Sequence, residues 1–340
     1  MSSPEAYRAL LQAGQKVDVD PYNRYDALAS EDDLSLLFEV LTSFYDKRGN
    51  SPVITANTVV ANPDFERIRE SDFKVYYYER FTETLQRYPC HRRSFSLWRE
   101  GMANRIFYPQ FHGREHVNVG QWMEALSTQR KEFLQAFNHH LFGVSMGNPI
   151  SKRKNLMASL DYKTNEQKEK LREMLEDGTR IFEEIFGYRS RSFIAPCYLW
   201  DTDIEPLLNT LGVSFLQGIP FQYQPSLERQ FRKKYHFTGQ QNRDGQIFLV
   251  RNCFFEPSLM EGIDWVDECL KRIQTAFRWS KPAIIGSHRL NYIGFIDVRN
   301  RDKNLKLLRE LLRRIIHNWP DVEFMHTEQL GRLIEHSKKP

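Results

Sequence analysis

Two histidines four residues apart form the densest cluster of chemically active side chains in the sequence. They lie in the string Phe111-His112-Gly113-Arg114-Glu115-His116. Imidazoles at this spacing on a turn or a helix can bind one divalent ion, and zinc is the ion expected for imidazole ligands with an open position. The alternative is a pair of polar loop histidines, one of which caps a backbone group. We expect a divalent metal, zinc first, at His112 and His116.

The same string spells His-x-x-Glu-His, the inverted motif of a class of zinc peptidases. In such a peptidase Glu115 would activate a water molecule, and the motif would lie on a helix. Pro109 and Gly113 flank or interrupt the segment, and the preceding Ile106-Phe107-Tyr108 favours extended structure. A zinc peptidase is therefore the second alternative function. Otherwise we expect Glu115 to lie behind the metal ligands or at the surface.

A third histidine ends an apolar run. His288 follows Ala283-Ile284-Ile285-Gly286-Ser287, and Arg289 comes directly after it. Histidine is a common general acid because its charge changes near neutral pH. The alternative is a buried histidine whose ring is hydrogen-bonded by the backbone. The polar neighbours favour a catalytic role for His288.

Four other candidate residues lie near the ends of apolar runs. Tyr198 and Trp200 offer flat aromatic faces for stacking on a sugar ring, or else belong to the core. Asn57 ends the apolar run that begins at Val53 and is a candidate substrate-binding residue. Glu256 is a candidate carboxylate for the chemistry, as is Glu115.

Short apolar runs alternate with amphipathic segments, and these elements must position the candidate residues. We predict strands over 53–57, 105–111, 191–196, 213–216, 247–251, 283–287 and 322–325. We predict helices over 30–45, 119–137, 164–186, 202–211, 261–279 and 300–319, and a last one from Glu328. The alternation predicts parallel βαβ units and an α/β sheet or barrel. In such barrels the chemistry lies at the carboxyl ends of the strands, where His112 and His288 both fall.

In this order the motifs resemble those of the NodB-homology polysaccharide deacetylases, a family of the carbohydrate esterase type. The string from His112 to His116 is similar to the family's second motif, and the run ending in His288 is similar to a later motif whose histidine is catalytic. Phe193 to Tyr198 is similar in outline to an aromatic-Arg-Pro-Pro-Tyr segment, with Ile194 where the family has arginine. The resemblance extends from about Val53 to the C-terminus.

The resemblance implies a fold and an activity. The fold is a distorted (β/α) barrel of the glycoside hydrolase and deacetylase type, in a single domain over 1–340, with a helical part at 1–50 and the barrel at 53–336. The activity is metal-dependent hydrolysis in carbohydrate metabolism. It removes acetyl groups from an N-acetylated or O-acetylated sugar or polysaccharide, at a non-peptide C–N bond or a carboxylic ester. His112 and His116 would hold the metal, and His288 would protonate the leaving group.

The family's first motif has no counterpart in the sequence. It consists of two adjacent aspartates after the first barrel strand, one a metal ligand and the other a general base. The Asp32-Asp33 pair follows Ser30 and opens a predicted helix, so we interpret it as part of a helix cap. The resemblance then implies either a chain that begins after the first strand, or a homologue without full catalysis. A catalytically impaired carbohydrate-binding homologue is therefore the first alternative.

Composition excludes several other classes of protein. The net charge is only +4, from 48 basic and 44 acidic residues. We interpret the densest basic cluster, 229–234, as a solvated loop. We therefore expect no nucleic-acid partner. The four cysteines are far apart, which favours buried free thiols in a reducing compartment. No apolar run of about 18 residues and no signal pattern occur, so we expect a cytoplasmic protein with no membrane partner.

Overall fold

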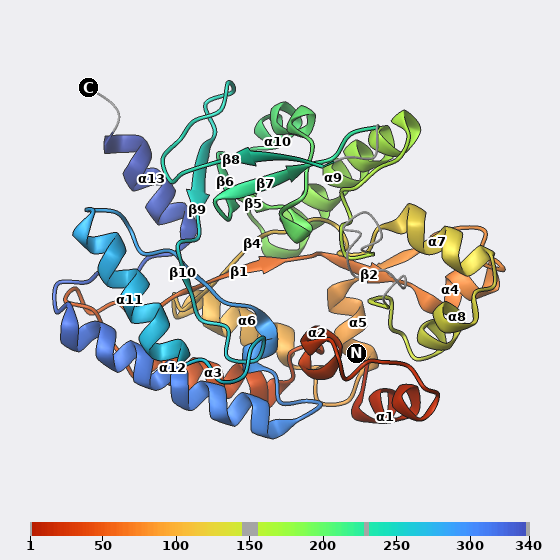
Figure 1. Cartoon of the computed structure of the whole chain (residues 1–340), viewed down its shortest axis with the longest axis horizontal. Coiled ribbons are helices and arrows are strands. Elements are labelled where there is room, and N and C mark those ends of the chain that lie inside the picture. The colour runs from red at the N-terminus through yellow and green to blue at the C-terminus, as the bar shows by residue number, and fades with distance from the viewer. Residues whose placement is uncertain (1, 145–155, 228–230, 338–340) are drawn as a thin grey trace. The chain divides into compact units, whose positions relative to one another are not determined.

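The computed structural model describes residues 2–144, 156–227 and 231–337 (Figure 1). The structure is mixed α/β, and its main sheet has five strands in the order β1-β4-β5-β6-β9. The chain divides into two compact units, each assembled from separate stretches of sequence. Unit 1 comprises Met1–Thr55, Leu85–Tyr108 and Arg251–His326, and unit 2 comprises Ala56–Thr84, Pro109–Val250 and Thr327–Pro340.

The five-stranded sheet confirms the prediction of parallel α/β structure. Its strands are β1 (Ile54–Thr58), β4 (Phe107–Phe111), β5 (Ser192–Ile194), β6 (Phe215–Gly218) and β9 (Ile247–Val250). The pairs β4–β5, β5–β6 and β6–β9 are parallel. All four residues of β6 and of β9 are buried, as expected for parallel strands covered on both faces. Among the described residues, no pairing joins β9 to β1, so the sheet is open as described.

Unit 1 is mainly helical. Its elements are α1 (Pro4–Gln12), α2 (Pro21–Tyr25), α3 (Glu31–Thr42), α6 (Ser94–Ala103), β10 (Cys253–Phe254), α11 (Trp265–Arg278), β11 (Ile285–Gly286), η4 (Arg289–Tyr292) and α12 (Val298–Asn318). In α12 the buried residues Leu305, Leu308, Leu312 and Ile315 recur every three or four positions. This stripe packs in one core with residues of α3 and α11.

Unit 2 contains most of the sheet and a separate core. Its other elements are β2 (Ala61–Pro63), α4 (Phe65–Glu70), β3 (Tyr78–Arg80), α7 (Val119–Ser127), α8 (Lys131–Asn138), α9 (Asn165–Phe186), η2 (Pro196–Tyr198), η3 (Thr202–Ile204), α10 (Glu205–Thr210), β7 (Phe221–Gln224), β8 (Arg232–Tyr235) and α13 (Thr327–Ser337), and α5 (Phe81–Arg87) contributes residues to both units. Phe111, Phe193 and Phe248 anchor the core on the sheet. The longest helix, α9, covers this core with Leu175 and Phe182.

Local signals in the sequence account for most element boundaries. Helix α9 follows the prediction for 164–186, with Thr164 capping its N-terminus and Gly187 ending it at φ 76°. The predicted helix over 119–137 is wrong as a single helix, because Gln129 adopts φ 55° between α7 and α8. The predicted strand over 322–325 is also wrong. There the backbone N–H of Phe324 donates to the Asp46 carboxylate, and the segment joins no strand.

The basic cluster at 229–234 is not simply a loop. Residues 229 and 230 lie outside the described residues, whereas 232–234 belong to β8, which pairs antiparallel with β7. None of the four cysteines, all of which lie in the described ranges, forms a disulfide. Cys253 and Cys269 are buried as expected, but Cys90 is exposed. None of the helices in the described ranges has the length and apolar character needed to cross a bilayer.

Candidate functional site

Parallel pairing of two short strands in unit 1 brings a carboxylate to a histidine. Strand β10 pairs with β11 so that Phe254 lies opposite Gly286. Two further hydrogen bonds hold together the residues that follow these strands. The Phe255 N–H donates to the Gly286 carbonyl, and the Ser287 hydroxyl donates to the Phe255 carbonyl. Glu256 and His288 therefore leave the paired strands at the same level, although they lie 32 residues apart in sequence.

The His288 imidazole is hydrogen-bonded to the Glu256 carboxylate. Nδ1 of His288 lies 2.7 Å from Oε1 of Glu256, and the His288 backbone N–H donates to Oε2 at 3.2 Å. Because a carboxylate can only accept, Nδ1 carries the proton and Nε2 is the basic nitrogen of the neutral ring. The side chain of His288 is 35% exposed and that of Glu256 only 6%, so the imidazole is accessible while its partner is enclosed.

Asn291 and Tyr22 hold this pair in place. The Asn291 amide donates to Oε2 of Glu256 at 2.8 Å and to the Ser287 hydroxyl at 3.1 Å. The Tyr22 ring meets the His288 ring edge-on, with centroids 5.5 Å apart. We did not predict either residue from the sequence. Asn291 lies three positions after His288 on η4, and only that spacing could have indicated its role.

The Asp32-Asp33 pair caps α3, as predicted. The Ser30 hydroxyl accepts from the Asp33 N–H, and the Asp33 carboxylate accepts from the Ser30 N–H. The other oxygen of Asp33 accepts from Arg301 Nη1 at 3.0 Å and from the Gly294 N–H at 2.9 Å. The Asp33 side chain is 1% exposed. Asp33 therefore stabilises unit 1 as a buried cap and ion pair.

In unit 2, His112 and His116 lie side by side in a loop after β4. Their ring centroids are 5.0 Å apart and their planes are nearly perpendicular. His112 Nδ1 donates to the Ile194 carbonyl at 2.7 Å, which directs the basic electron pair to Nε2. The segment 112–116 is not helical. The extended structure that we expected for the preceding residues is strand β4, and the inverted zinc-peptidase motif requires a helix instead.

A tight turn after β5 supports the histidine loop. Gly113 has φ 107°, a conformation that favours glycine, and a Cβ at this position would lie 3.9 Å from Pro196. Cys197 and Tyr198 both have φ 55°, which is unusual for residues with side chains. Strained backbone of this kind concentrates at functional sites. Tyr198 is half-buried, so a substrate-binding role for it stays a prediction.

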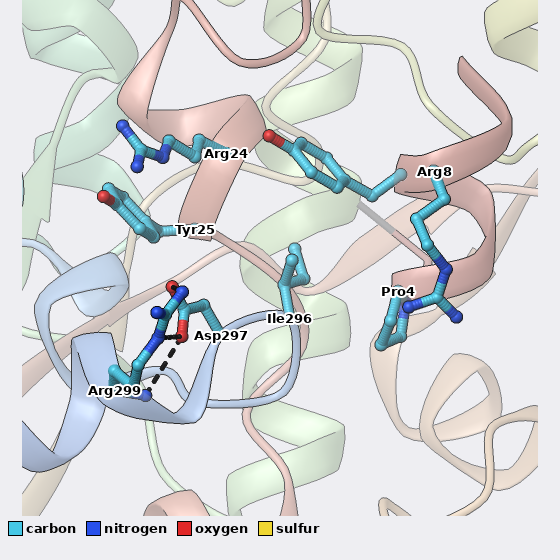
Figure 2. A pocket seen from close by; sticks show the side chains of 8 residues that line it. Pro4, Arg8, Arg24, Tyr25, Ile296, Asp297 and Arg299 are labelled. Carbon is cyan, nitrogen blue, oxygen red and sulfur yellow. Dashed lines mark hydrogen bonds and ion pairs between the residues drawn. The ribbon is translucent and has the colours of Figure 1, made fainter. Parts of the chain in front are cut away.

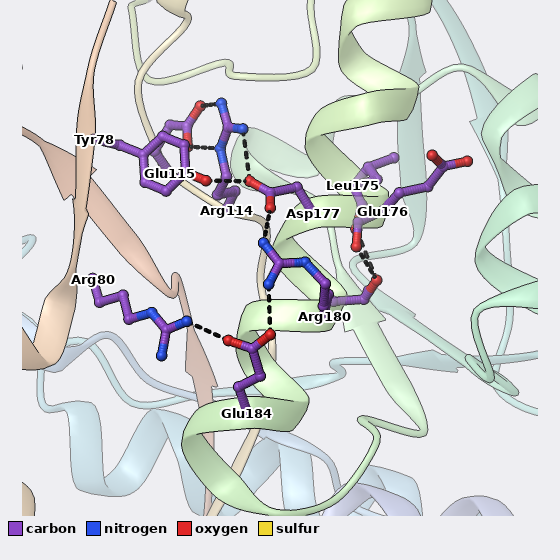
Figure 3. Close-up of polar contacts among 10 residues, drawn as sticks. Tyr78, Arg80, Arg114, Glu115, Leu175, Glu176, Asp177, Arg180 and Glu184 are labelled. Atoms are coloured by element: carbon purple, nitrogen blue, oxygen red, sulfur yellow. Dashed lines mark hydrogen bonds and ion pairs between the residues drawn. The ribbon is translucent and has the colours of Figure 1, made fainter.

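Glu115 belongs to a buried ion-pair network, which Figure 3 shows. Both of its oxygens accept from Arg114, at 2.6 and 2.9 Å, and its side chain is 1% exposed. Arg114 also donates to Asp177 at 3.0 Å, and the Tyr78 hydroxyl donates to the same carboxylate at 2.6 Å. Gly178 on α9 allows the close approach, because a Cβ there would lie 3.0 Å from that of Arg114. Burial raises the pKa of Glu115 above its usual range, although Arg114 acts against it.

This network argues against two of the roles considered for Glu115. It is not at the surface, and both oxygens of its carboxylate accept hydrogen bonds from Arg114, which leaves it unsuited to act as a general base.

The prediction that Trp200 stacks on a sugar ring is wrong, and the alternative, a core residue, holds. It is 4% exposed, its Nε1 donates to Glu205, and its ring stacks on His236. A buried ring offers no face to a substrate, so Trp200 belongs to the core.

Asn57 lies within a polar network along the sheet. Its Oδ1 accepts from Gln217 Nε2 at 2.8 Å, and the same amide donates to Ser192 Oγ at 2.9 Å. Ser192 in turn donates to Gln110 at 2.7 Å. These side chains come from β1, β6, β5 and β4, respectively. Asn57 is half-buried, and its substrate-binding role stays a prediction.

The metal prediction has two well-placed imidazoles in its favour. The orientation of His112 by a backbone carbonyl fits a metal ligand. Across residues 2–144, 156–227 and 231–337, however, no group of three or more His, Cys, Asp or Glu side chains is arranged to hold an ion. His112 and His288 belong to different units. That both lie at the carboxyl ends of the strands of one barrel therefore stays a prediction.

No protein-family model matches the chain, and no curated protein matches it. Among solved structures, the chain is similar to the crystal structure of 4-alpha-glucanotransferase from Thermococcus litoralis, with a TM-score of 0.45 and 11% sequence identity. The similarity covers 95% of this chain and 37% of that one.

Proposed function

We propose that this protein is a hydrolase that removes acetyl groups from an N-acetylated or O-acetylated sugar or polysaccharide, with His288 as its general acid. The observation that carries the proposal is the hydrogen bond between His288 Nδ1 and Glu256. It fixes the tautomer and the ring orientation, so that Nε2 is the nitrogen available for proton transfer. The parallel α/β sheet supports a distorted barrel as the scaffold.

The proposed roles follow from the hydrogen bonds of each group. Water adds to the acetyl carbonyl and loses a proton to bulk solvent, and the bond from the carbonyl carbon to nitrogen or oxygen breaks to release acetate. Protonated His288 delivers its Nε2 proton to the leaving atom and is protonated again from solvent. Glu256 stabilises the imidazolium ring. Because His288 Nδ1 donates to Oε1 and the His288 backbone N–H and the Asn291 amide donate to Oε2, we assign Glu256 to orienting His288 and not to taking a proton from water.

A metal is proposed at His112 and His116 as the second element of the activity. A divalent ion such as zinc held there would supply Lewis-acid chemistry, which polarises a carbonyl group and activates a bound water molecule. The Ile194 carbonyl would keep His112 in the orientation of a ligand. Glu115 would support the loop from behind through Arg114.

The test is acetate release from acetylated chito-oligomers and from O-acetylated sugars, with zinc present. His288→Ala should abolish release with nearly unchanged thermal stability, because a general acid contributes roughly 10²–10⁴-fold without holding the fold. The more conservative His288→Gln should behave in the same way. His317→Ala, an exposed position on α12, is the matched control. Sugar binding without acetate release from the wild type would support the catalytically impaired homologue instead.

A further inference from the structure

A hollow of about 320 Å³ lies in unit 1 beside α1, α2 and the start of α12. Its lining includes three arginines, two tyrosines and one aspartate, namely Arg8, Arg24, Arg299, Tyr7, Tyr25 and Asp297. Figure 2 shows Arg24 and Tyr25 on one side of the hollow and Arg8 on another. The volume is at the small end of the range for ligand pockets, which suits a single sugar unit rather than a long oligomer.

Two of the three arginines already have carboxylate partners. Arg299 donates to both oxygens of Asp297 at 3.0 Å, and Arg8 pairs with Glu5 at 2.7 Å. Arg24 is different. Within the described ranges it has no carboxylate partner, and its guanidinium lies 4.8 Å from the ring centroid of Tyr25. The hollow therefore presents one guanidinium that forms no ion pair within the described ranges, beside an aromatic ring and within electrostatic reach of the Asp297 carboxylate.

The short helix α2 connects this hollow to His288. Tyr22, one turn before Tyr25, contacts the His288 ring, and Asp26 at the end of the helix pairs with Arg289 through two hydrogen bonds of 2.9 Å. Residues three apart on a helix are separated by about 4.5 Å along its axis. A sugar unit at Arg24 and Tyr25 would thus be close to a unit at His288.

We infer that the hollow binds a carboxylate-bearing sugar, a uronate unit next to the acetylated unit of the same polysaccharide. This inference rests on the proposed function. A guanidinium fork matches a carboxylate with two parallel hydrogen bonds, and the faces of tyrosine rings pack against the apolar face of a sugar ring. Burial raises the pKa of the Tyr7 and Tyr25 phenols, so both hydroxyls stay protonated as donors to sugar oxygens. The Asp297–Arg299 pair offers further hydrogen-bonding groups to hydroxyls without adding net charge.

The experiment is calorimetric titration of the full chain with tetragalacturonate and with its methyl-esterified form. The ester keeps the sugar rings and removes the charges. The wild type should bind the acid at least fivefold more tightly than the ester, and salt at high concentration should weaken only the binding of the acid. Arg24→Gln should lose this preference, and Arg24→Lys should keep part of it because it retains the charge without the fork. Arg309→Gln, on the exposed face of α12 and outside the hollow, is the matched control and should bind as the wild type does.

Binding is measured without turnover, so it separates this inference from the proposed activity. His288→Ala should keep the preference for tetragalacturonate over its ester even where acetate release is lost. Equal affinity for acid and ester, an unchanged preference in Arg24→Gln, or binding of inorganic phosphate as tight as that of tetragalacturonate would each overturn the inference. A wild type that prefers the acid but releases no acetate would support this site and contradict the proposed deacetylase activity.

Discussion

Glu256 accepts a 2.7 Å hydrogen bond from His288 Nδ1, and each residue lies two positions after the end of one of two strands, β10 and β11, that pair in parallel. Glu256→Gln keeps the size of the side chain but removes the charge that stabilises a protonated imidazole. We expect acetate release to fall at least tenfold through kcat rather than KM, because the change affects proton transfer and not substrate contacts. The downfield proton signal of the His288 Nδ1–H should also shift or vanish in the NMR spectrum.

The control for this prediction is Glu261→Gln, an exposed carboxylate five residues further along the chain. It should change neither kcat nor the NMR signal. If the role of Glu256 were purely structural, Glu256→Gln would instead lower thermal stability and leave kcat per folded molecule as in the wild type. That result would contradict the proposed pair.

The histidine loop of unit 2 should bind zinc weakly. His112 and His116 supply two ligands, whereas catalytic zinc sites usually have three from the protein. We expect the wild type to retain zinc after incubation and a brief desalting step, and the double variant His112→Ala/His116→Ala to retain none above background. Elemental analysis per mole of protein measures this, with His317→Ala as the control. Equal zinc in the wild type and the double variant would show that the loop histidines are ordinary polar residues.

Removal of the Glu115 carboxylate should cost stability. Glu115→Ala leaves the buried Arg114 guanidinium without its principal partner, and a broken buried ion pair costs about 3–5 kcal/mol. Glu184→Ala acts at the exposed end of the same network, where Glu184 pairs with Arg180, and should cost far less stability, because solvent screens exposed ion pairs. Urea unfolding followed by circular dichroism gives both values. A stable Glu115→Ala variant that loses only acetate release would restore Glu115 as a catalytic base.

Sequence patterns predicted those parts of the fold that depend on neighbouring residues. The caps of α9 at Thr164 and Gly187, and the place of His288 after an apolar strand, follow from local chemistry. The partnership of His288 with Glu256 does not, because strand pairing alone brings together these two residues, which lie 32 positions apart in the sequence. The sequence suggested Glu256 only as one of two carboxylates, with no indication that its partner was a histidine.

The errors also have physical causes. Adjacent Arg114 and Glu115 look like two solvated charges in the sequence, but the packing of Phe111 and Gly178 places the loop against α9 and buries the pair. Trp200 looks like a sugar platform because it follows a strand, yet tertiary contacts with Glu205 and His236 bury its ring. Burial of this kind is decided by distant residues, so no local pattern reports it.

His236 should make unit 2 sensitive to mild acid. Its ring is stacked between Trp200 and Phe248, and its Nε2–H donates to Gln222 at 2.8 Å. Burial, aided by the charge of Lys234, lowers the pKa of His236 from 6.5 to about 4. Between these two values the unfolded chain binds a proton that the folded chain does not. The free energy of unfolding should therefore fall as the pH drops from about 6.5 to about 4, by on the order of 2–3 kcal/mol in total.

His236→Phe tests this prediction, because phenylalanine keeps an aromatic ring between Trp200 and Phe248 but cannot be protonated. Loss of the hydrogen bond to Gln222 should lower stability by a similar amount at every pH, whereas loss of the titration should flatten the decline between pH 6.5 and 4. Urea unfolding at intervals of half a pH unit separates the two effects. His317→Gln removes an exposed histidine and should leave the decline unchanged. If His236→Phe loses stability toward pH 4 as steeply as the wild type, then His236 is not the group whose protonation destabilises the fold.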